Sequence, residues 1–310
     1  MRIPIVSTAC KQVQPLVSFQ GGGLQAGLNM ETFFRRKDKV VFVIGATGTG
    51  KSRLAVDLAT RFPSEIINSD KIQVYKGLEI TTNKVTDDEC RGVPHHLLGI
   101  ADPYSNYTAA DFCHHTSSAI ESILDRGKLP IIAGGSNSYI DCCYLWVDVS
   151  LPVLHAFMSE RVDRMVAAGL VDEVRKMFDP AADYSRGIRR AIGVPELDEF
   201  FRAEARGTSK KTREGLLNSA IERSRRTKIR RLHPQWSWNV HRLDATEAFL
   251  RRRRRQDSDE AWENLVAEPA NMIIGEFLYG EGISAMIPST TTAGTGGLLP
   301  APTAVSIATR

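Results

Sequence analysis

A chain of 310 residues with 42% hydrophobic residues is long enough to bury a core, in one large domain or two small ones. The formal charge of +4 arises in the first 37 residues, and the rest holds 35 basic and 35 acidic residues. Such a balance argues against a polyanionic partner, and no run approaches the ~18 apolar residues of a membrane-spanning helix. We therefore expect a monomeric, small-molecule enzyme that binds no nucleic acid and no membrane.

The two ends of the chain differ in composition from its middle. Residues 1–36 are poor in acids and mildly basic, which is typical of a plastid or mitochondrial transit peptide and also of a disordered N-terminus. Residues 284–310 are Thr, Ala, Gly and Pro with one charge, which predicts a disordered tail. We expect a plastid protein, with the cytoplasm and the mitochondrion as alternatives.

The cysteines predict neither disulfides nor a structural metal. Their number is odd, no C-x-x-C spacing occurs, and no histidine lies at the distance of a zinc ligand. The cysteines therefore predict that the protein resides in a reducing compartment. The five are Cys10, Cys90, Cys113, Cys142 and Cys143.

Strands and helices alternate from residue 40 onward. Residues 40–44 form a β-branched and aromatic run of the kind found in a central parallel strand. A glycine-rich turn follows, then residues 52–62 place their apolar side chains on one helical face, and residues 65–68 read as a second short strand.

Two further apolar runs, 129–133 and 144–149, predict strands, and a helix is expected after Ser150. Residues 195–206 and 211–232 have helical spacing. This order predicts an α/β fold: a P-loop NTPase-like, doubly wound parallel sheet followed by a helical C-terminal part, over residues 37–283.

A phosphate-binding loop lies between the first strand and the first helix. Its backbone N–H groups turn inward onto phosphate oxygens, Lys51 adds a positive charge, and the Ser52 hydroxyl can bind Mg²⁺. The sequence therefore predicts a diphosphate site with Mg²⁺ as its cofactor. The loop is Gly45-Ala46-Thr47-Gly48-Thr49-Gly50-Lys51-Ser52.

Asp70 follows the second strand and should lie at the carboxyl edge of the sheet, where ligands of open α/β sheets bind. It should be near the P-loop if the two strands are neighbours. An acid at this place can hold Mg²⁺, cap a helix or act as a general base, and its position alone does not choose among these roles.

The blocks that follow resemble the isopentenyltransferase family. They are N-S-D-K-I-Q-V-Y-K-G-L from Asn68, T-N-K from Thr82, V-P-H-H-L-L-G from Val93, A-A-D-F from Ala109, A-G-G-S-N-S-Y from Ala133, L-W-V-D-V-S from Leu145 and R-R-A-I-G-V-P-E from Arg189. Their order resembles the plant adenylate enzymes of cytokinin synthesis more than the branch that modifies tRNA.

The resemblance implies prenyl transfer from dimethylallyl diphosphate to N6 of an adenine nucleotide. The P-loop would then hold the diphosphate of the donor, together with Lys51 and Arg189 or Arg190, and Asp70 would accept the N6 proton. Ser136 matches a hydroxyl residue near the diphosphate, although a helix N-cap explains it equally well.

Other readings remain open at this stage. Arg189 and Arg190 could instead be a solvated pair on a loop. Histidines placed like those at 95 and 96 are more often structural, and we assign them no chemistry. The arginine run 251–255 is more typical of a solvated helix end than of a nucleic-acid patch. The rival functions are a tRNA dimethylallyltransferase, a small-molecule P-loop kinase and a non-catalytic remnant of the family.

The segment between the strands 129–133 and 144–149 is unusually short. A parallel crossover with its helix takes at least about 10 to 12 residues. Relatives continue after the residues that correspond to Ile140 with a further charged segment, and the stretch 221–232 also resembles two ends of a family helix without its middle. We therefore predict that this chain turns over slowly.

Overall fold

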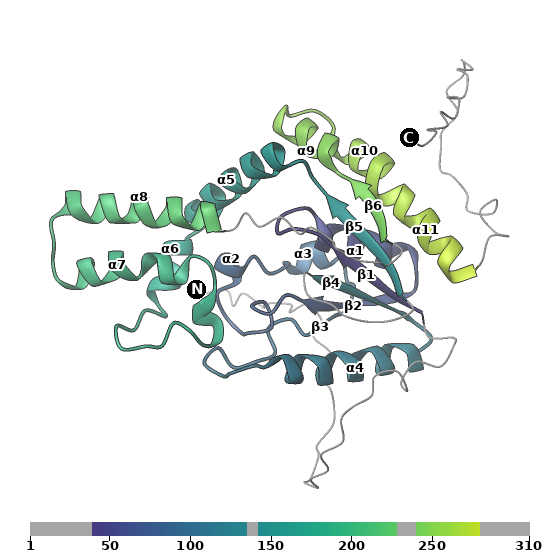
Figure 1. The fold of residues 1–310 in the computed structure, drawn as a ribbon, viewed down its shortest axis with the longest axis horizontal. Coiled ribbons are helices and arrows are strands. Elements are labelled where there is room, and N and C mark those ends of the chain that lie inside the picture. Colours follow the sequence, from purple (N-terminus) through teal and green to yellow (C-terminus); the bar gives the residue numbers. More distant parts are fainter. Residues whose placement is uncertain (1–38, 135–141, 228–239, 280–310) are drawn as a thin grey trace, which may run out of the picture.

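A six-stranded parallel sheet forms the centre of the protein in the computed structural model, which describes residues 39–134, 142–227 and 240–279 (Figure 1). The strands are ordered β3-β2-β4-β1-β5-β6. They are β1 (Val40–Ile44), β2 (Ser64–Ser69), β3 (His95–His96), β4 (Leu129–Gly134), β5 (Cys142–Asp148) and β6 (Val240–Asp244).

Helices cover both faces of the sheet and extend beyond one end of it. They are α1 (Lys51–Arg61), α2 (Glu79–Thr82), α3 (Asp87–Cys90), α4 (Ala109–Asp125), α5 (Leu151–Ala167), α6 (Leu170–Arg175), α7 (Val194–Ala205), α8 (Lys210–Thr227), α9 (Thr246–Arg253), α10 (Ser258–Trp262) and α11 (Glu268–Tyr279).

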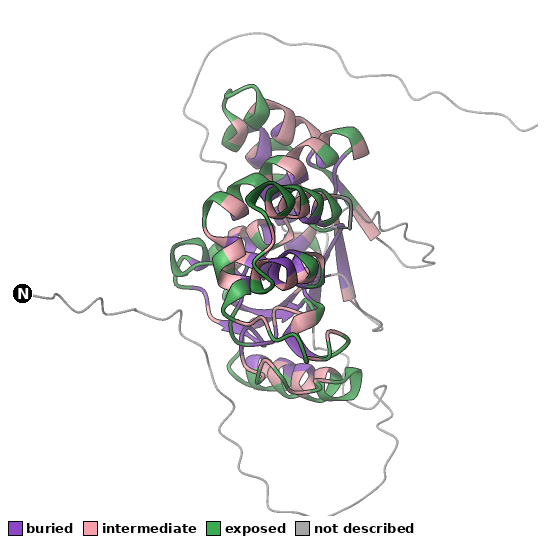
Figure 2. Cartoon of the chain, turned by 90° about the vertical axis from the view of Figure 1, so that its left-hand side faces the viewer, coloured by how far each residue is buried: buried purple, intermediate pink, exposed green. Residues whose placement is uncertain are grey.

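The alternation of side chains along each strand divides the core between two layers. On one face Val41, Ile131 and Leu145 pack with α1, α5 and the C-terminal helices. On the other face Phe42 and Ile132 pack with α4. A third cluster lies among α2, α6, α7 and α8, of which α7 and α8 project beyond the sheet (Figure 1). Figure 2 looks at the molecule from that side.

The expected α/β fold is confirmed, and so are the strands and helices predicted from residue 40 to residue 68. Two details differ. β2 is separated from β1 by β4, so these two strands are not neighbours. The C-terminal part is also not purely helical, because β6 returns to the sheet and pairs with β5. β6 has only five residues and lies between helices, so its sequence gave no distinct strand signal.

The short segment between β4 and β5 joins two parallel strands that flank β1. The strands end at Gly134 and begin at Cys142, so seven residues connect them. Residues 135–141, including Ser136, lie outside the described residues. The same holds for residues 228–232 of the helix predicted over 211–232, and for the predicted terminal segments 1–36 and 284–310.

Candidate active site

The P-loop turns at three glycines between β1 and α1. Gly45, Gly48 and Gly50 have φ angles of 153°, 85° and 97°. Residues with a Cβ rarely adopt such angles, which explains why the turn needs glycine. The loop leads directly into the N-terminus of α1, where the first N–H groups have no partner within the helix and attract an anion.

Two side chains from distant parts of the sequence support this loop. A Cβ on Gly48 would collide with the sulfur of Met158 in α5, and a Cβ on Gly50 would lie 2.6 Å from the ring of Trp262 in α10. Trp262 also donates from Nε1 to Asp57 of α1 at 2.8 Å. The loop is therefore packed between α5 and α10.

Lys51, the first residue of α1, is bound to its own loop. Its Nζ donates to the carbonyl oxygen of Ala46 at 2.7 Å. Burial lowers the pKa of Lys51 to about 8, while the carboxylate of Asp70 raises it and the Arg161 guanidinium lowers it further. The charges of Asp70 and Arg161 therefore both act on the Lys51 ammonium.

Asp70 lies at the carboxyl end of β2 and is exposed. Its backbone is fixed by buried Asn68, whose amide donates to the Asp70 carbonyl at 3.1 Å and accepts from the Asp70 N–H at 3.1 Å. Oδ1 of Asp70 accepts from the N–H of Ile72 at 2.8 Å. Oδ2 has no hydrogen-bond partner among the described residues, so it is free to face a ligand.

Although β1 and β2 are not neighbours, both end at the same edge of the parallel sheet. Asp70 therefore still approaches Lys51 across β4, whose last residue, Gly134, packs against Ser69 so closely that a Cβ would lie 2.5 Å from the Ser69 backbone. Asp70 was expected near the P-loop if β1 and β2 were neighbours, and that condition is not met, since β4 lies between them.

Arg161 of α5 is a site residue that the sequence analysis missed. An added Cβ on Gly48 would lie 3.6 Å from its guanidinium, and its Nε is buried with no hydrogen-bond partner in the part of the chain described. Burial lowers the pKa of Arg161, and Arg164 lowers it further. Its place one helical turn after Met158 is the only sequence signal, and it requires knowing that α5 packs on the loop.

Arg189 and Arg190 each contact a tyrosine. Arg189 stacks on the ring of Tyr104, with its guanidinium carbon 4.6 Å from the ring centroid. Arg190 donates to the hydroxyl of Tyr75 at 3.5 Å. Neither contacts the P-loop within the described residues, so their assignment to the diphosphate remains a prediction.

The two histidines at 95 and 96 form β3 and are buried. Nε2 of His96 lies 2.7 Å from Glu65, a buried acid that also accepts from Arg126 at 2.7 Å and Lys128 at 2.9 Å. Burial alone would raise the pKa of Glu65, but these hydrogen bonds outweigh it and hold the pKa at about 2. The cluster is structural, as expected.

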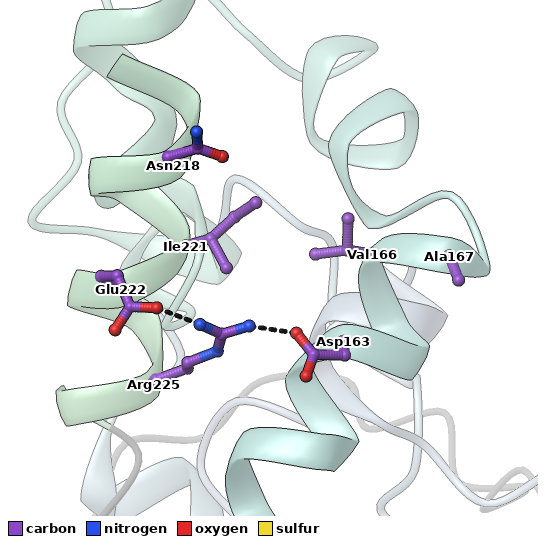
Figure 3. Close-up of a pocket in the computed structure, with 7 residues that line it drawn as sticks. All are labelled: Asp163, Val166, Ala167, Asn218, Ile221, Glu222 and Arg225. Atoms are coloured by element: carbon purple, nitrogen blue, oxygen red, sulfur yellow. Dashed lines mark hydrogen bonds and ion pairs between the residues drawn. The ribbon is translucent and has the colours of Figure 1, made fainter. Parts of the chain in front are cut away.

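A pocket also lies away from the P-loop, among the helices beyond the sheet. A cavity of about 330 Å³ lies between α5 and α8, where Arg225 bridges Asp163 and Glu222 (Figure 3). Since the charged groups that face it are paired with one another, we place the chemistry at the P-loop instead. The lining residues are Asp163, Val166, Ala167, Asn218, Ile221, Glu222 and Arg225.

Comparison with known proteins adds to this geometry. The model of the IPP transferase family matches residues 73–145 and 139–241, together more than half of the chain. The chain is 54% identical to adenylate isopentenyltransferase 5, chloroplastic, of Arabidopsis thaliana over 98% of each protein. It is 51% identical to adenylate isopentenyltransferase 7, mitochondrial, of the same plant over 87% of this chain and 89% of the relative.

A solved eukaryotic dimethylallyltransferase that acts on tRNA has the same fold. The TM-score is 0.64 at 22% identity, over 78% of this chain and 79% of that one.

The comparisons also bear on the short segment between β4 and β5. The alignment with adenylate isopentenyltransferase 5 extends over 337 positions, more than the 310 residues present here, so that relative has residues without a counterpart in this chain. The family match is also broken into two stretches that meet at residues 139–145.

Proposed function

The chain belongs to the IPP transferase family, and we propose that it is an adenylate isopentenyltransferase. It transfers the dimethylallyl group of dimethylallyl diphosphate to N6 of ADP or ATP, or of AMP, in the first step of cytokinin biosynthesis. The observation that carries the proposal is that a P-loop lysine, Lys51, and a carboxylate with an unbonded oxygen, Asp70, follow strands that end at the same edge of the parallel sheet. One group suits a departing diphosphate and the other an attacking amine.

The P-loop side stabilises the leaving group. As the bond between C1 and the diphosphate oxygen breaks, the electron pair stays on the diphosphate, whose negative charge grows. The loop N–H groups, the Lys51 ammonium and the Arg161 guanidinium face that charge. The carbonyl of Ala46, which accepts from Lys51 at 2.7 Å, keeps the ammonium in place until the donor binds.

The Asp70 side acts on the acceptor. N6 of adenine is a weak nucleophile because its lone pair is delocalised into the ring. As the bond from N6 to C1 forms, the N6 proton moves to Oδ2 of Asp70, while Oδ1 remains bound to the Ile72 N–H at 2.8 Å. The turn therefore holds one carboxylate oxygen and presents the other.

The residues present fit a Mg²⁺ ion that is held mainly by the donor. No group of three or more acidic, His or Cys side chains in the described ranges could hold a metal alone. The exposed Ser52 hydroxyl, which has no hydrogen-bond partner in those ranges, suits an ion that takes its other ligands from phosphate oxygens and water. Such an ion would neutralise charge on the diphosphate.

Incubation with dimethylallyl diphosphate and, in turn, AMP, ADP, ATP and an RNA anticodon stem-loop tests the proposal. Formation of an N6-prenyl nucleotide supports it. Prenylation of the RNA alone would identify a tRNA dimethylallyltransferase. This enzyme is the main rival, because a solved protein with the same fold acts on tRNA. Phosphoryl transfer between nucleotides would instead identify a P-loop kinase.

We also propose that the protein acts in plastids, since relatives at 54% and 50% identity are named chloroplastic, although the one at 51% is named mitochondrial. A fluorescent fusion to residues 1–36 tests this. Signal confined to the cytosol would refute it.

A further inference from the structure

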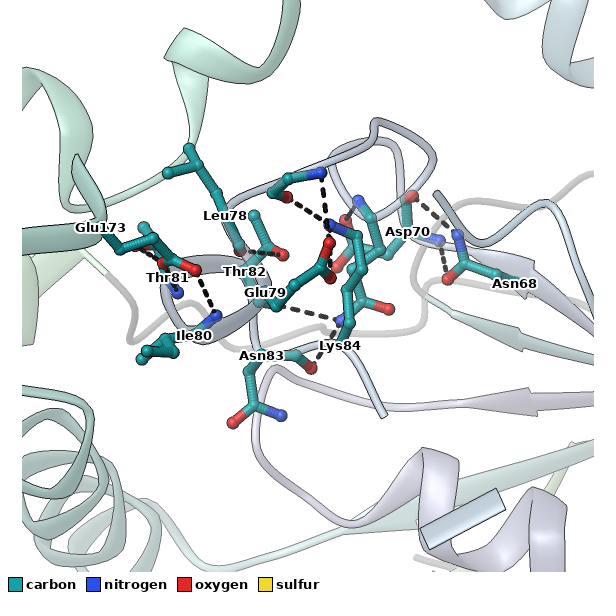
Figure 4. Close-up of polar contacts among 12 residues, drawn as sticks. Asn68, Asp70, Leu78, Glu79, Ile80, Thr81, Thr82, Asn83, Lys84 and Glu173 are labelled. Atoms are coloured by element: carbon teal, nitrogen blue, oxygen red, sulfur yellow. Dashed lines mark hydrogen bonds and ion pairs between the residues drawn. The ribbon is translucent and has the colours of Figure 1, made fainter. Parts of the chain in front are cut away.

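The short helix α2 is bound from outside by Glu173 of α6 (Figure 4). The Glu173 carboxylate accepts from the N–H of Ile80 at 2.9 Å, the N–H of Thr81 at 2.8 Å and the hydroxyl of Thr81 at 2.6 Å. A helix of four residues is unstable alone, and its first N–H groups lack partners within it. Leu78 at the N-cap provides no side-chain cap, so Glu173 provides it.

Gln73 binds the other end of α2. Its side-chain amide donates to the carbonyl oxygens of Thr82 and Asn83, at 3.0 Å each. These carbonyls belong to the last turn, where helix acceptors are unsatisfied. The helix is therefore fixed between an acid of the projecting helices and an amide of the turn after β2.

The same glutamine belongs to the turn that holds Asp70. The N–H groups of Ile72 and Gln73 point at Oδ1 of Asp70, at 2.8 and 3.4 Å. The contacts thus run without interruption from Glu173 through α2 to Gln73, and from Gln73 to the Asp70 carboxylate. This path joins α6, which lies outside the sheet, to a side chain at the sheet edge.

We propose that Glu173 is a positioning residue for Asp70, a role that rests on the proposed function only in taking Asp70 as the base. Glu173 is half-buried and forms no ion pair within the described part of the chain. In the described ranges, the donors to its carboxylate are N–H and O–H groups of α2. An acid so placed orders a segment, whereas an ordinary surface acid would pair with a neighbouring base or with water.

The test compares Glu173→Ala and Glu173→Gln with a matched control, Asp172→Asn. Asp172 is the adjacent acid of α6, is exposed and pairs with Arg175 instead of α2. Two quantities are measured: amide hydrogen exchange over residues 72–82, and the kcat for N6-prenyl-ADP formation beside the affinity for inorganic diphosphate.

In Glu173→Ala we expect faster exchange at Ile80 and Thr81 and also at Ile72 and Gln73. A displacement of about 1 Å at Asp70 would lower kcat on the order of 10²-fold, with diphosphate affinity unchanged because the P-loop is not on the path. Glu173→Gln, which keeps one acceptor oxygen, should recover part of both. Asp172→Asn should match the wild type.

Unchanged exchange at Ile72 and Gln73 in Glu173→Ala would overturn the proposal, as would a kcat within twofold of wild type despite faster exchange. An equal loss of diphosphate affinity would indicate general loosening and overturn it too. If the wild type formed no N6-prenyl nucleotide, the proposed function would fail, and the exchange at Ile72 and Gln73 would still decide whether Glu173 positions the turn.

Discussion

Restoring a family-like segment after Ile140 is expected to raise both the rate and the stability of this protein. β4 and β5 run parallel on either side of β1 and are joined by only seven residues. The register places Ala133 and Leu145 level with Val43. Gly134 therefore lies level with Trp146, four residues along the strand from Cys142.

The distance to be covered follows from this register. Four residues along a strand and two strand spacings across it give about 16 Å in a straight line. The connection must also pass over β1, and seven residues, with eight steps between Cα atoms, reach at most about 26 to 29 Å. They can join the two ends, but they fall short of the ~10 to 12 residues of a helical crossover.

An inserted helical crossover would cover a definite face of the sheet. The path from β3 to β4 crosses the sheet in the same direction as one from β4 to β5 and places α4 on one face, so an inserted right-handed crossover would lie over that same face. Trp146 and Val240 lie on it and are only partly buried. Since at most about a third of each side chain is still exposed, covering both would contribute about 1 kcal/mol, or a rise in Tm of about 2 to 4 °C.

The rate should rise as well because the connection begins beside the site. Gly134 packs on the backbone of Ser69, the neighbour of Asp70. If the short connection displaces this edge by about 1 Å, insertion of the relative's segment should raise the rate of prenyl transfer on the order of 10²-fold. The assay compares N6-prenyl-ADP formation and Tm in three proteins: wild type, the relative's segment inserted, and a Gly/Ser insertion of equal length as control.

Equal rates and equal Tm in the wild type and the protein with the relative's segment would refute this reasoning, since the seven-residue connection would then be sufficient. A gain that the Gly/Ser control reproduced in full would show that length alone matters and that cover of Trp146 does not.

Three further predictions concern single side chains. Asp70→Ala should lower turnover on the order of 10² to 10⁴-fold while the enzyme still binds diphosphate, and near-normal turnover would rule out Asp70 as the base. Lys51→Ala should weaken donor affinity and slow the reaction. In the wild type, donor affinity should fall as the pH rises through about 8, because the lowered pKa of Lys51 means that its ammonium is lost there. An affinity that did not change up to pH 10 would contradict a contact between Lys51 and the donor diphosphate. Glu65→Gln should cost about 3 kcal/mol of unfolding free energy at pH 7, measured with denaturant. Because the pKa of Glu65 is lowered from 4.5 to about 2, its contribution is complete above about pH 5 and is lost as the pH falls to 2; a Tm independent of pH in that range would exclude it.

Local sequence was sufficient for the P-loop and its two flanking elements. Glycines at positions with positive φ, a β-branched run before them and an amphipathic run after them each act within a few residues. Asp70 was likewise found from its place after a strand, because parallel strands end at one edge of a sheet whatever their order.

The order of the strands, the arginine beside the loop and the path from Glu173 were decided by tertiary structure alone. The sequence of β4 does not reveal that it lies between β1 and β2, since a buried strand is apolar on both faces wherever it pairs. Arg161 and Glu173 lie on helices whose charges look like those of any solvated face. They gain their contacts only when α5 packs on Gly48 and α6 packs on α2, over separations of 113 and 92 residues, where one sequence without its fold gives no physical signal.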